Sequence, residues 1–307
     1  MSTILIGVDE STRSEDAIAF GNRLAAVSSA HVVVACAFPF NDAIRDGSGG
    51  MYRKALSDQA EKTARDLRDR LDAVAADRRQ IRTTPNPSAA HALHDIARVE
   101  HAELIVVGSS HTGRLGRVAP GSTGERLLHG APCAVAIVPD GYAARTDVPI
   151  RRIGVAYDGS DEATAAVATA VTLARALSAE LEIIGVVVPQ AGAGPGMLGD
   201  AVYLTPQDEL DQYVQDALDA VIAGLPDDIK ADSVRLAGDA ADQLGERSES
   251  LDLMLAGSRG YGPLRSVLVG GVSGRLIHTV HCPVIIVPRG ADAPLATLFS
   301  STAVAAA

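Results

Sequence analysis

The stretch that decides the fold is GSRGYGPLRSVLVGGVSGRLIHTVHCPVIIVP, residues 257–288. It places several glycines between two apolar runs that are typical of buried β-strands. Glycine inside a folded element lowers stability, because it loses more backbone freedom than any other residue. The glycines therefore indicate either plain turns or a place where another group approaches the backbone closely.

The same pattern occurs earlier in the chain at a constant separation. Asp9 of ILIGVDES corresponds to Asp158 of IGVAYDGS, 149 residues later. At that separation Leu24 also corresponds to Leu173, Gly108 to Gly257, Gly121 to Gly270, Arg126 to Arg275, and Cys133 to Cys282. Because one separation serves the whole length, we interpret the chain as two copies of one domain, residues 1–141 and 150–290. Residues 291–307 have no counterpart, and we expect an unassigned, mobile tail.

Each copy alternates short apolar runs with stretches of helical period. In the first copy we expect strands at 3–8, 31–38, 79–84, 103–108 and 134–139, and helices at 13–29, 52–76, 87–100 and 122–130. Strands that are apolar on both faces are typical of a parallel sheet covered by helices. With right-handed crossovers, the prediction is an α/β, Rossmann-like fold: two tandem doubly wound sheets of five parallel strands, order 3-2-1-4-5.

Composition excludes several classes of protein. The 307 residues carry a net charge of −11, with aromatic residues at 3% and no tryptophan. An acidic chain with so few stacking surfaces is not expected to bind nucleic acid. No apolar run is long enough to span a membrane, and no signal peptide is recognised, so we expect a cytoplasmic protein. Its three cysteines stand in apolar runs and are expected to be buried, reduced thiols.

A nucleotide pocket is predicted in each copy. Asp9 and Asp158 end first strands, while Gly108 and Gly257 end fourth strands. In the order 3-2-1-4-5 these strands are neighbours at the switch point, where doubly wound sheets bind ligands. Backbone amides would hold phosphates, apolar strand ends the base, and the carboxylate the sugar or base edge. The alternative is that the glycines only shape turns and Asp9 caps a helix.

The motifs of phosphoryl transfer are missing from the sequence. It contains no G-x-x-x-x-G-K-[ST] and no lysine in either glycine loop. No G-x-G-x-x-G follows a first strand, so the dinucleotide fingerprint is also lacking. We therefore expect nucleotide binding without catalytic residues, and leave a slow ATPase as an alternative.

At GSRG…GGVS the sequence resembles the universal stress protein family, whose ATP-binding members carry G-x-x-G, nine residues, then G-[S/T]. In the second copy Gly257, Gly260 and Gly270 match this spacing. Gly271 replaces the expected hydroxyl residue, and Ser273 matches a later one.

The first copy resembles the family pattern with a different departure. Gly108, Gly121 and Ser122 match, but His111 occupies the second glycine position. The openings GVDES and AYDGS and the ending CPVIIVP also resemble the family, so the resemblance covers both copies.

The resemblance implies that the chain binds ATP, with or without Mg²⁺, through a defined set of residues. In the first copy the implied contacts are Asp9, Ala37, Val107, Gly108, Gly121, Ser122 and Thr123. In the second copy they are Asp158, Val186, Ala256, Gly257, Arg259, Gly260, Gly270, Gly271, Val272 and Ser273. The aspartates would contact adenosine, Ala37 and Val186 the adenine, and the loop residues the phosphates.

The resemblance also implies pairing through the last strand of each domain. A tandem chain would satisfy that contact internally, by pairing the first copy with the second, and a homodimer is a further possibility. The remaining alternative is an interaction module of the same fold that binds no nucleotide. His91 and His94 are expected to be solvated rather than metal-binding, and Ser122 with Glu125 forms a capping-box pattern.

Overall fold

The computed structural model describes residues 2–40, 49–109, 122–188, 207–258, 271–288 and 295–300. The first half contains β1 (Thr3–Val8), α1 (Arg13–Ala26), β2 (His31–Phe38), α2 (Gly49–Arg68), η1 (Ala76–Arg78), β3 (Arg79–Pro85), α3 (Ala89–Val99), β4 (Leu104–Gly108), α4 (Ser122–Leu128) and β5 (Ala134–Val138). After the linking turn η2 (Tyr142–Arg145), the second half contains β6 (Arg152–Ala156), α5 (Asp161–Leu177), β7 (Glu180–Val187), α6 (Gln207–Ala223), β8 (Ala231–Ala237), α7 (Ala240–Arg247), η3 (Ser248–Ser250), β9 (Leu253–Ser258), α8 (Val272–Leu276) and β10 (Val284–Pro288), followed by α9 (Ala296–Ser300). The α/β alternation is confirmed in both halves.

The strands form one continuous sheet, in which the two predicted five-stranded sheets are joined. The sheet has ten strands in the order β3-β2-β1-β4-β5-β10-β9-β6-β7-β8. All neighbours run parallel except β5 and β10, which pair antiparallel with Val284 opposite Ile137. The last strand of each half would otherwise be a bare edge with unpaired backbone groups. The expected internal pairing of the two copies therefore joins their two sheets into one.

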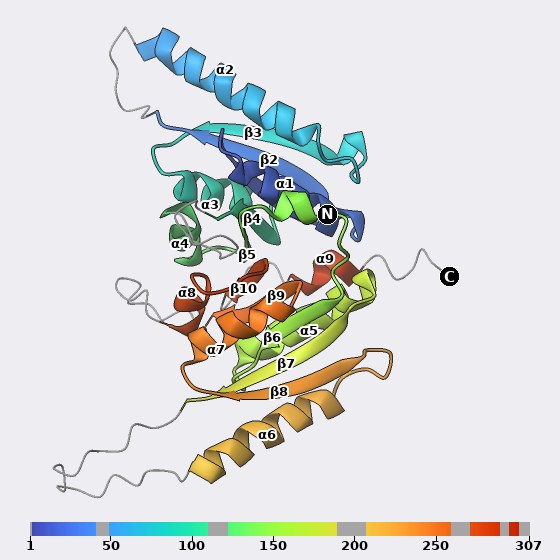
Figure 1. Cartoon of the computed structure of the whole chain (residues 1–307). Coiled ribbons are helices and arrows are strands. Elements are labelled where there is room, and N and C mark those ends of the chain that lie inside the picture. Colours follow the sequence, from blue (N-terminus) through green and yellow to red (C-terminus); the bar gives the residue numbers. More distant parts are fainter. Residues whose placement is uncertain are drawn as a thin grey trace, which may run out of the picture.

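Helices cover both faces of this sheet (Figure 1). One core lies between the sheet and the helices α1, α2, α5, α6 and α9, and the other between the sheet and α3, α4, α7 and α8. Successive residues of β1 supply opposite cores: Ile4 and Ile6 belong to the first, and Leu5 to the second. Burial on both faces is why the strands read as unbroken apolar runs, each such side chain contributing roughly 1.5–3 kcal/mol.

The linker between the halves is anchored to α1. The buried carboxylate of Asp16 accepts hydrogen bonds from the backbone nitrogens of Gly141, at 3.2 Å, and Ala143, at 2.8 Å. The Tyr142 ring packs edge-on against Phe20, with 5.5 Å between centroids. Burial raises the pKa of Asp16, although these two hydrogen bonds oppose the shift. The linker is therefore part of the first core rather than a loose tether.

The expectation of a mobile tail is wrong for residues 295–300. Leu295, Leu298 and Phe299 are at most 3% exposed and join the core beside α5. The Thr297 hydroxyl also donates to Glu103 of the first half at 3.0 Å. Apolar side chains at this spacing lie on one face of a helix, so burial fixes the segment. Residues 295–300 thus contact both halves.

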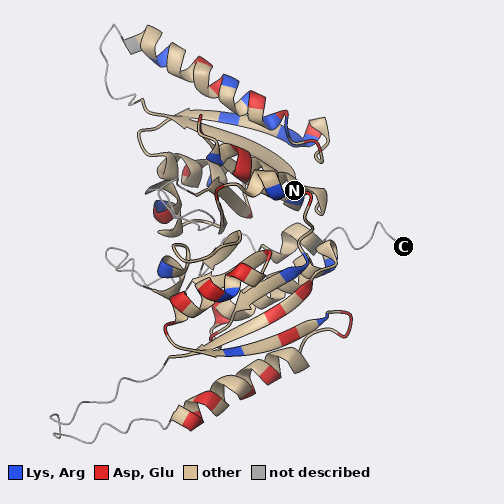
Figure 2. Cartoon of the chain, viewed as in Figure 1, with Lys and Arg blue, Asp and Glu red and all other residues tan. Residues whose placement is uncertain are grey.

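Surface charge differs between the two outermost helices. In Figure 2 α2 carries both signs, whereas α6 shows acidic residues and, in its sequence, neither lysine nor arginine. On α2, Lys54 pairs with Asp58 at 2.7 Å and Lys62 with Asp66 at 2.8 Å. Exposed pairs of this kind contribute little stability, about 0–1 kcal/mol each.

Among the described residues, no helix combines the length and the apolar character needed to cross a bilayer.

The expectation of buried, reduced cysteines is confirmed. Cys36, Cys133 and Cys282 are all buried and unpaired as disulfides. Burial, with a smaller contribution from the charge of Asp9, raises the pKa of Cys36 to about 11. Its sulfur is therefore a neutral thiol at pH 7, without the thiolate that reactive cysteines need.

Candidate functional site

The structure brings the predicted carboxylate and glycine together in each half. β1 pairs with β4 in parallel, with Ile6 opposite Val106, so Asp9 and Gly108 follow the same edge of the sheet. β6 and β9 repeat this arrangement for Asp158. These are the switch points of the two halves, because each first strand lies between its second and fourth strands.

Gly108 and Gly257 have a packing role that the sequence did not reveal. A Cβ atom on Gly257 would lie 2.6 Å from the carbonyl carbon of Glu162 and 2.7 Å from the nitrogen of Ala163, both in α5. A Cβ on Gly108 would collide with the carbonyl oxygen of Arg13 in α1. Close approach of strand and helix thus requires glycine at both positions. Contact of these glycines with phosphate stays a prediction.

The carboxylate of Asp9 is held by three residues of the turn that leads into α1. Its Oδ1 accepts hydrogen bonds from the Ser11 backbone nitrogen at 2.9 Å and the Ser14 hydroxyl at 3.1 Å. Its Oδ2 pairs with the Arg13 guanidinium at 3.1 Å. Partial desolvation acts to raise the pKa of Asp9, but the hydrogen bonds from Ser11, the charge of Arg13 and the Ser14 hydroxyl together lower it.

The second half also holds its carboxylate, Asp158, through a serine turn. Its Oδ1 accepts hydrogen bonds from the Ser160 nitrogen at 3.1 Å and hydroxyl at 2.6 Å. The positions that correspond to Arg13 and Ser14 are Glu162 and Ala163. The two carboxylates therefore share the serine turn.

The residues expected near the adenine lie at strand ends. Ala37 and Val186 are half-buried at the ends of β2 and β7, beside the first strand of each half. Val107 and Ala256, expected to line the pocket, are only 5% and 3% exposed and belong to the second core. Their side chains therefore pack inside the protein, which leaves main-chain atoms as their means of contacting a ligand.

Among the described residues that are expected to contact phosphate, Gly271 has free space beside its backbone. A Cβ on Gly271 would meet no atom within 4 Å. Val272 is 41% exposed, and Thr123 and Ser273 are half-buried. The remaining expected contacts lie outside the described residues: Gly121, Arg259, Gly260, Gly270 and the side chain of Ser122, as does His111.

Two serines at this edge were missed by the sequence reasoning. Ser109, directly after β4, is 1% exposed, and its hydroxyl has no hydrogen-bond partner among the residues that the structure describes. At the corresponding position of the second half, the Ser258 hydroxyl accepts a hydrogen bond from Ser273 at 3.4 Å. Ser109 lacks this partner because Gly124 stands where Ser273 would correspond. An unpaired buried hydroxyl is costly unless another group satisfies it. The repeat of serine after each fourth-strand glycine was the available signal.

The short helices of the two halves meet beside these sites (Figure 1). Glu125 of α4 pairs with His278, which follows α8, at 3.1 Å. Glu125 therefore has a role in joining the halves that the capping-box pattern did not predict. His94 is half-buried, with its Nε2 3.1 Å from the carbonyl oxygen of Leu127. Within the described ranges, no group of three potential metal ligands occurs.

The pH dependence of stability is expected to depend on Asp9. Because its folded-state pKa lies below the unfolded value, about 3.9, its contribution is present above that pH. It is lost as the pH falls through the folded-state pKa. Asp9→Asn should therefore lower the unfolding free energy near pH 6 by no more than about 1 kcal/mol, since the pair is half-exposed, and flatten the decline below about pH 4. Urea unfolding between these pH values measures the difference, with Asp58→Asn as the surface control. Equal pH profiles for Asp9→Asn and the wild type would contradict the assignment.

Comparison with known proteins gives the same family for both halves of the chain. Residues 1–139 and 149–288 each match the universal stress protein family. Universal stress proteins of Mycobacterium tuberculosis and Mycolicibacterium smegmatis are each 28% identical to this chain, over 92% and 93% of its length and 96% and 97% of their own. The crystal structure of a universal stress protein from Archaeoglobus fulgidus superposes with a TM-score of 0.70 at 19% identity, covering 94% of this chain and 98% of that one.

The two family matches coincide with the two halves of the sheet and together span most of the chain. The chain therefore belongs to the universal stress protein family, as a member with two family domains in tandem.

Proposed function

We propose that each half binds an adenine nucleotide, with ATP, alone or with Mg²⁺, as the expected ligand. The observation that carries this proposal is the repeated placement of a carboxylate, Asp9 or Asp158, at the switch point of a doubly wound half. Family membership supports it. In this proposal the protein takes part in the stress response by binding the nucleotide and does not catalyse a reaction on it.

Several described residues fit such a ligand. Carboxylate oxygens accept hydrogen bonds from ribose hydroxyls or the adenine amino group, which suits Asp158. Ala37 and Val186 offer apolar surface beside the carboxylates. The buried, unpaired hydroxyl of Ser109 is a donor for a phosphate oxygen, and the space at Gly271 admits a group close to the backbone.

A ligand that uses Asp9 competes with Arg13 and Ser14 for the same carboxylate. A ligand that uses Asp158 competes with Ser160 in the same way. Exchanging an existing charged hydrogen bond for a new one reduces the net gain on binding, so we expect a limited contribution from each carboxylate.

Calorimetric titration with ATP, with and without Mg²⁺, tests the proposal. Asp158→Ala should weaken the second-half site by roughly 10- to 100-fold, the equivalent of one or two charged hydrogen bonds, and leave the first-half site unchanged. Asp9→Ala should do the reverse, and Asp58→Ala on α2 should change neither. Wild-type protein that is folded but shows no saturable binding up to about 5 mM ATP would contradict the proposal, since that limit already corresponds to only about −3 kcal/mol.

The two alternatives predict different results. A pure interaction module predicts a melting temperature that is independent of ATP, whereas binding raises it with ligand concentration. A slow ATPase predicts ATP turnover that disappears in the double variant, which combines Asp9→Ala with Asp158→Ala. Turnover that survives in the double variant is a contaminating activity.

A further inference from the structure

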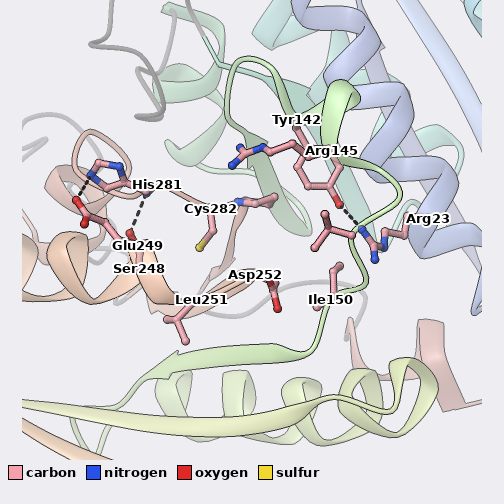
Figure 3. A pocket seen from close by; sticks show the side chains of 12 residues that line it. Arg23, Tyr142, Arg145, Ile150, Ser248, Glu249, Leu251, Asp252, His281 and Cys282 are labelled. Atoms are coloured by element: carbon pink, nitrogen blue, oxygen red, sulfur yellow. Dashed lines mark hydrogen bonds and ion pairs between the residues drawn. The ribbon is translucent and has the colours of Figure 1, made fainter.

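A cavity of about 290 Å³ lies where the linker meets the start of the second-half strands (Figure 3). Tyr142, Arg145 and Ile150 line it from the linker, and Leu251 and Cys282 from the second half. These second-half residues precede β9 and β10, whereas the nucleotide pocket is expected after the strands. The cavity is therefore separate from the sites proposed above.

The floor of the cavity is apolar and firmly packed. Ile150, Leu251 and Cys282 are 2%, 6% and 4% exposed. Burial raises the pKa of Cys282 far above its usual range, so this sulfur is a neutral, apolar group. These side chains leave little apolar surface in water, so a ligand that covers the floor makes van der Waals contact with it and gains only a small hydrophobic contribution, about 25 cal/mol for each Å² covered.

The acidic groups of the cavity are already engaged. Asp252 Oδ2 accepts hydrogen bonds from the backbone nitrogens of Arg151 and Arg152, at 2.8 and 2.9 Å. Glu249 lies 3.5 Å from His281, and its side chain is 65% exposed. Both carboxylates therefore have partners within the protein.

A cation without a partner completes the cavity. Arg145 is exposed, and its guanidinium makes no hydrogen bond or ion pair with the other described residues. Arg145 lines the same cavity as Tyr142 and Cys282, which places it beside the floor. Arg23, on the other side of the Tyr142 ring in Figure 3, donates one hydrogen bond to the Tyr142 hydroxyl at 3.3 Å.

We propose that this cavity binds a small organic carboxylate, with the carboxylate on Arg145 and an apolar body against Ile150, Leu251 and Cys282. A guanidinium presents its donors in a planar fork that matches a carboxylate. The volume lies at the small end of ligand-binding pockets, which favours a compact acid over a nucleotide. Because the linker and the second half both supply walls, a bound acid stabilises their contact.

Calorimetry with naphthalene-2-carboxylate, and with its neutral match 2-naphthamide, tests the proposal on the full chain. We expect saturable binding of one carboxylate per chain and at least about tenfold weaker binding of the amide, a loss equivalent to about 1.4 kcal/mol. Arg145→Gln should weaken carboxylate binding by the same factor and leave amide binding unchanged. Arg145→Lys should lose less, because it keeps the charge but not the fork.

The control variant is Arg65→Gln, which removes an exposed arginine from α2, away from the cavity. It should bind the carboxylate as the wild type does. Because Arg145 is exposed, its variants should melt at the wild-type temperature. The proposal is overturned if the carboxylate shows no saturable binding up to about 10 mM, a limit of roughly −3 kcal/mol. It is equally overturned if acid and amide bind alike, or if Arg145→Gln leaves acid binding unchanged.

Discussion

Gly257→Val is expected to destabilise the protein by about 3 kcal/mol or more, the upper range for overpacked sites. The first added carbon would already lie 2.6–2.7 Å from backbone atoms of Glu162 and Ala163. Backbone at the start of α5 cannot move aside as a flexible side chain can. Gly108→Val should act in the same way against Arg13. Urea unfolding followed by circular dichroism measures both effects.

Gly271→Ala is the matched control for these two variants. It lies at the same edge of the sheet, has an extended backbone with φ −72° and ψ 162°, and has no atom within 4 Å of an added Cβ. We expect a change within about 0.5 kcal/mol, as for ordinary exposed substitutions. A wild-type unfolding midpoint for Gly257→Val would show that the strand and helix do not approach as described.

This result bears on how nucleotide binding should be tested. Loss of ATP binding in Gly257→Val would report the displaced helix as readily as a blocked phosphate. Asp9 and Asp158 lie in half-exposed turns, where substitution disturbs the fold less than at Gly257. Their alanine variants therefore report ligand binding with less contribution from unfolding. Gly271 is the loop position at which a side chain can be introduced without a clash.

Phe299→Ala is expected to lower the unfolding free energy by about 3–5 kcal/mol, the usual cost of removing a buried aromatic ring. Phe299 is 3% exposed, in a helix of only five residues, which is too short to be stable without packing of this kind. Thermal unfolding and limited proteolysis near the end of the chain measure the effect. Thr297→Ala is the control: it removes an exposed hydroxyl that donates to Glu103 and should cost no more than about 1 kcal/mol. Equal stability of Phe299→Ala and Thr297→Ala would contradict the packing of α9.

The internal repeat made much of this architecture predictable. The start of α3 was predicted at Pro87 and Ser88, and in the structure Ser88 caps the helix by accepting a hydrogen bond from the His91 nitrogen at 3.4 Å. The end of α2 was placed too late, at residue 76 instead of Arg68. Leu71 and Val74 are buried in the turn that follows, so the apolar period outlasts the helix that it indicates.

What the sequence could not show concerns contacts between distant segments. α9 was missed because it has no counterpart in the first half, although Leu295, Leu298 and Phe299 have the spacing of one helical face. The roles of Gly108 and Gly257 were incomplete for a different reason. A missing Cβ is the same signal whether a helix or a ligand approaches, and only coordinates distinguish the two.

The antiparallel seam between β5 and β10 has an evolutionary consequence. Two identical subunits joined in this way would repeat every contact across the axis, so each substitution would appear twice. Here the pair of Glu125 with His278 has no such repeat, because Gly274 and His129 occupy the corresponding positions. Fusion of the halves into one polypeptide lets each side of the seam mutate independently, and dilution cannot separate the two.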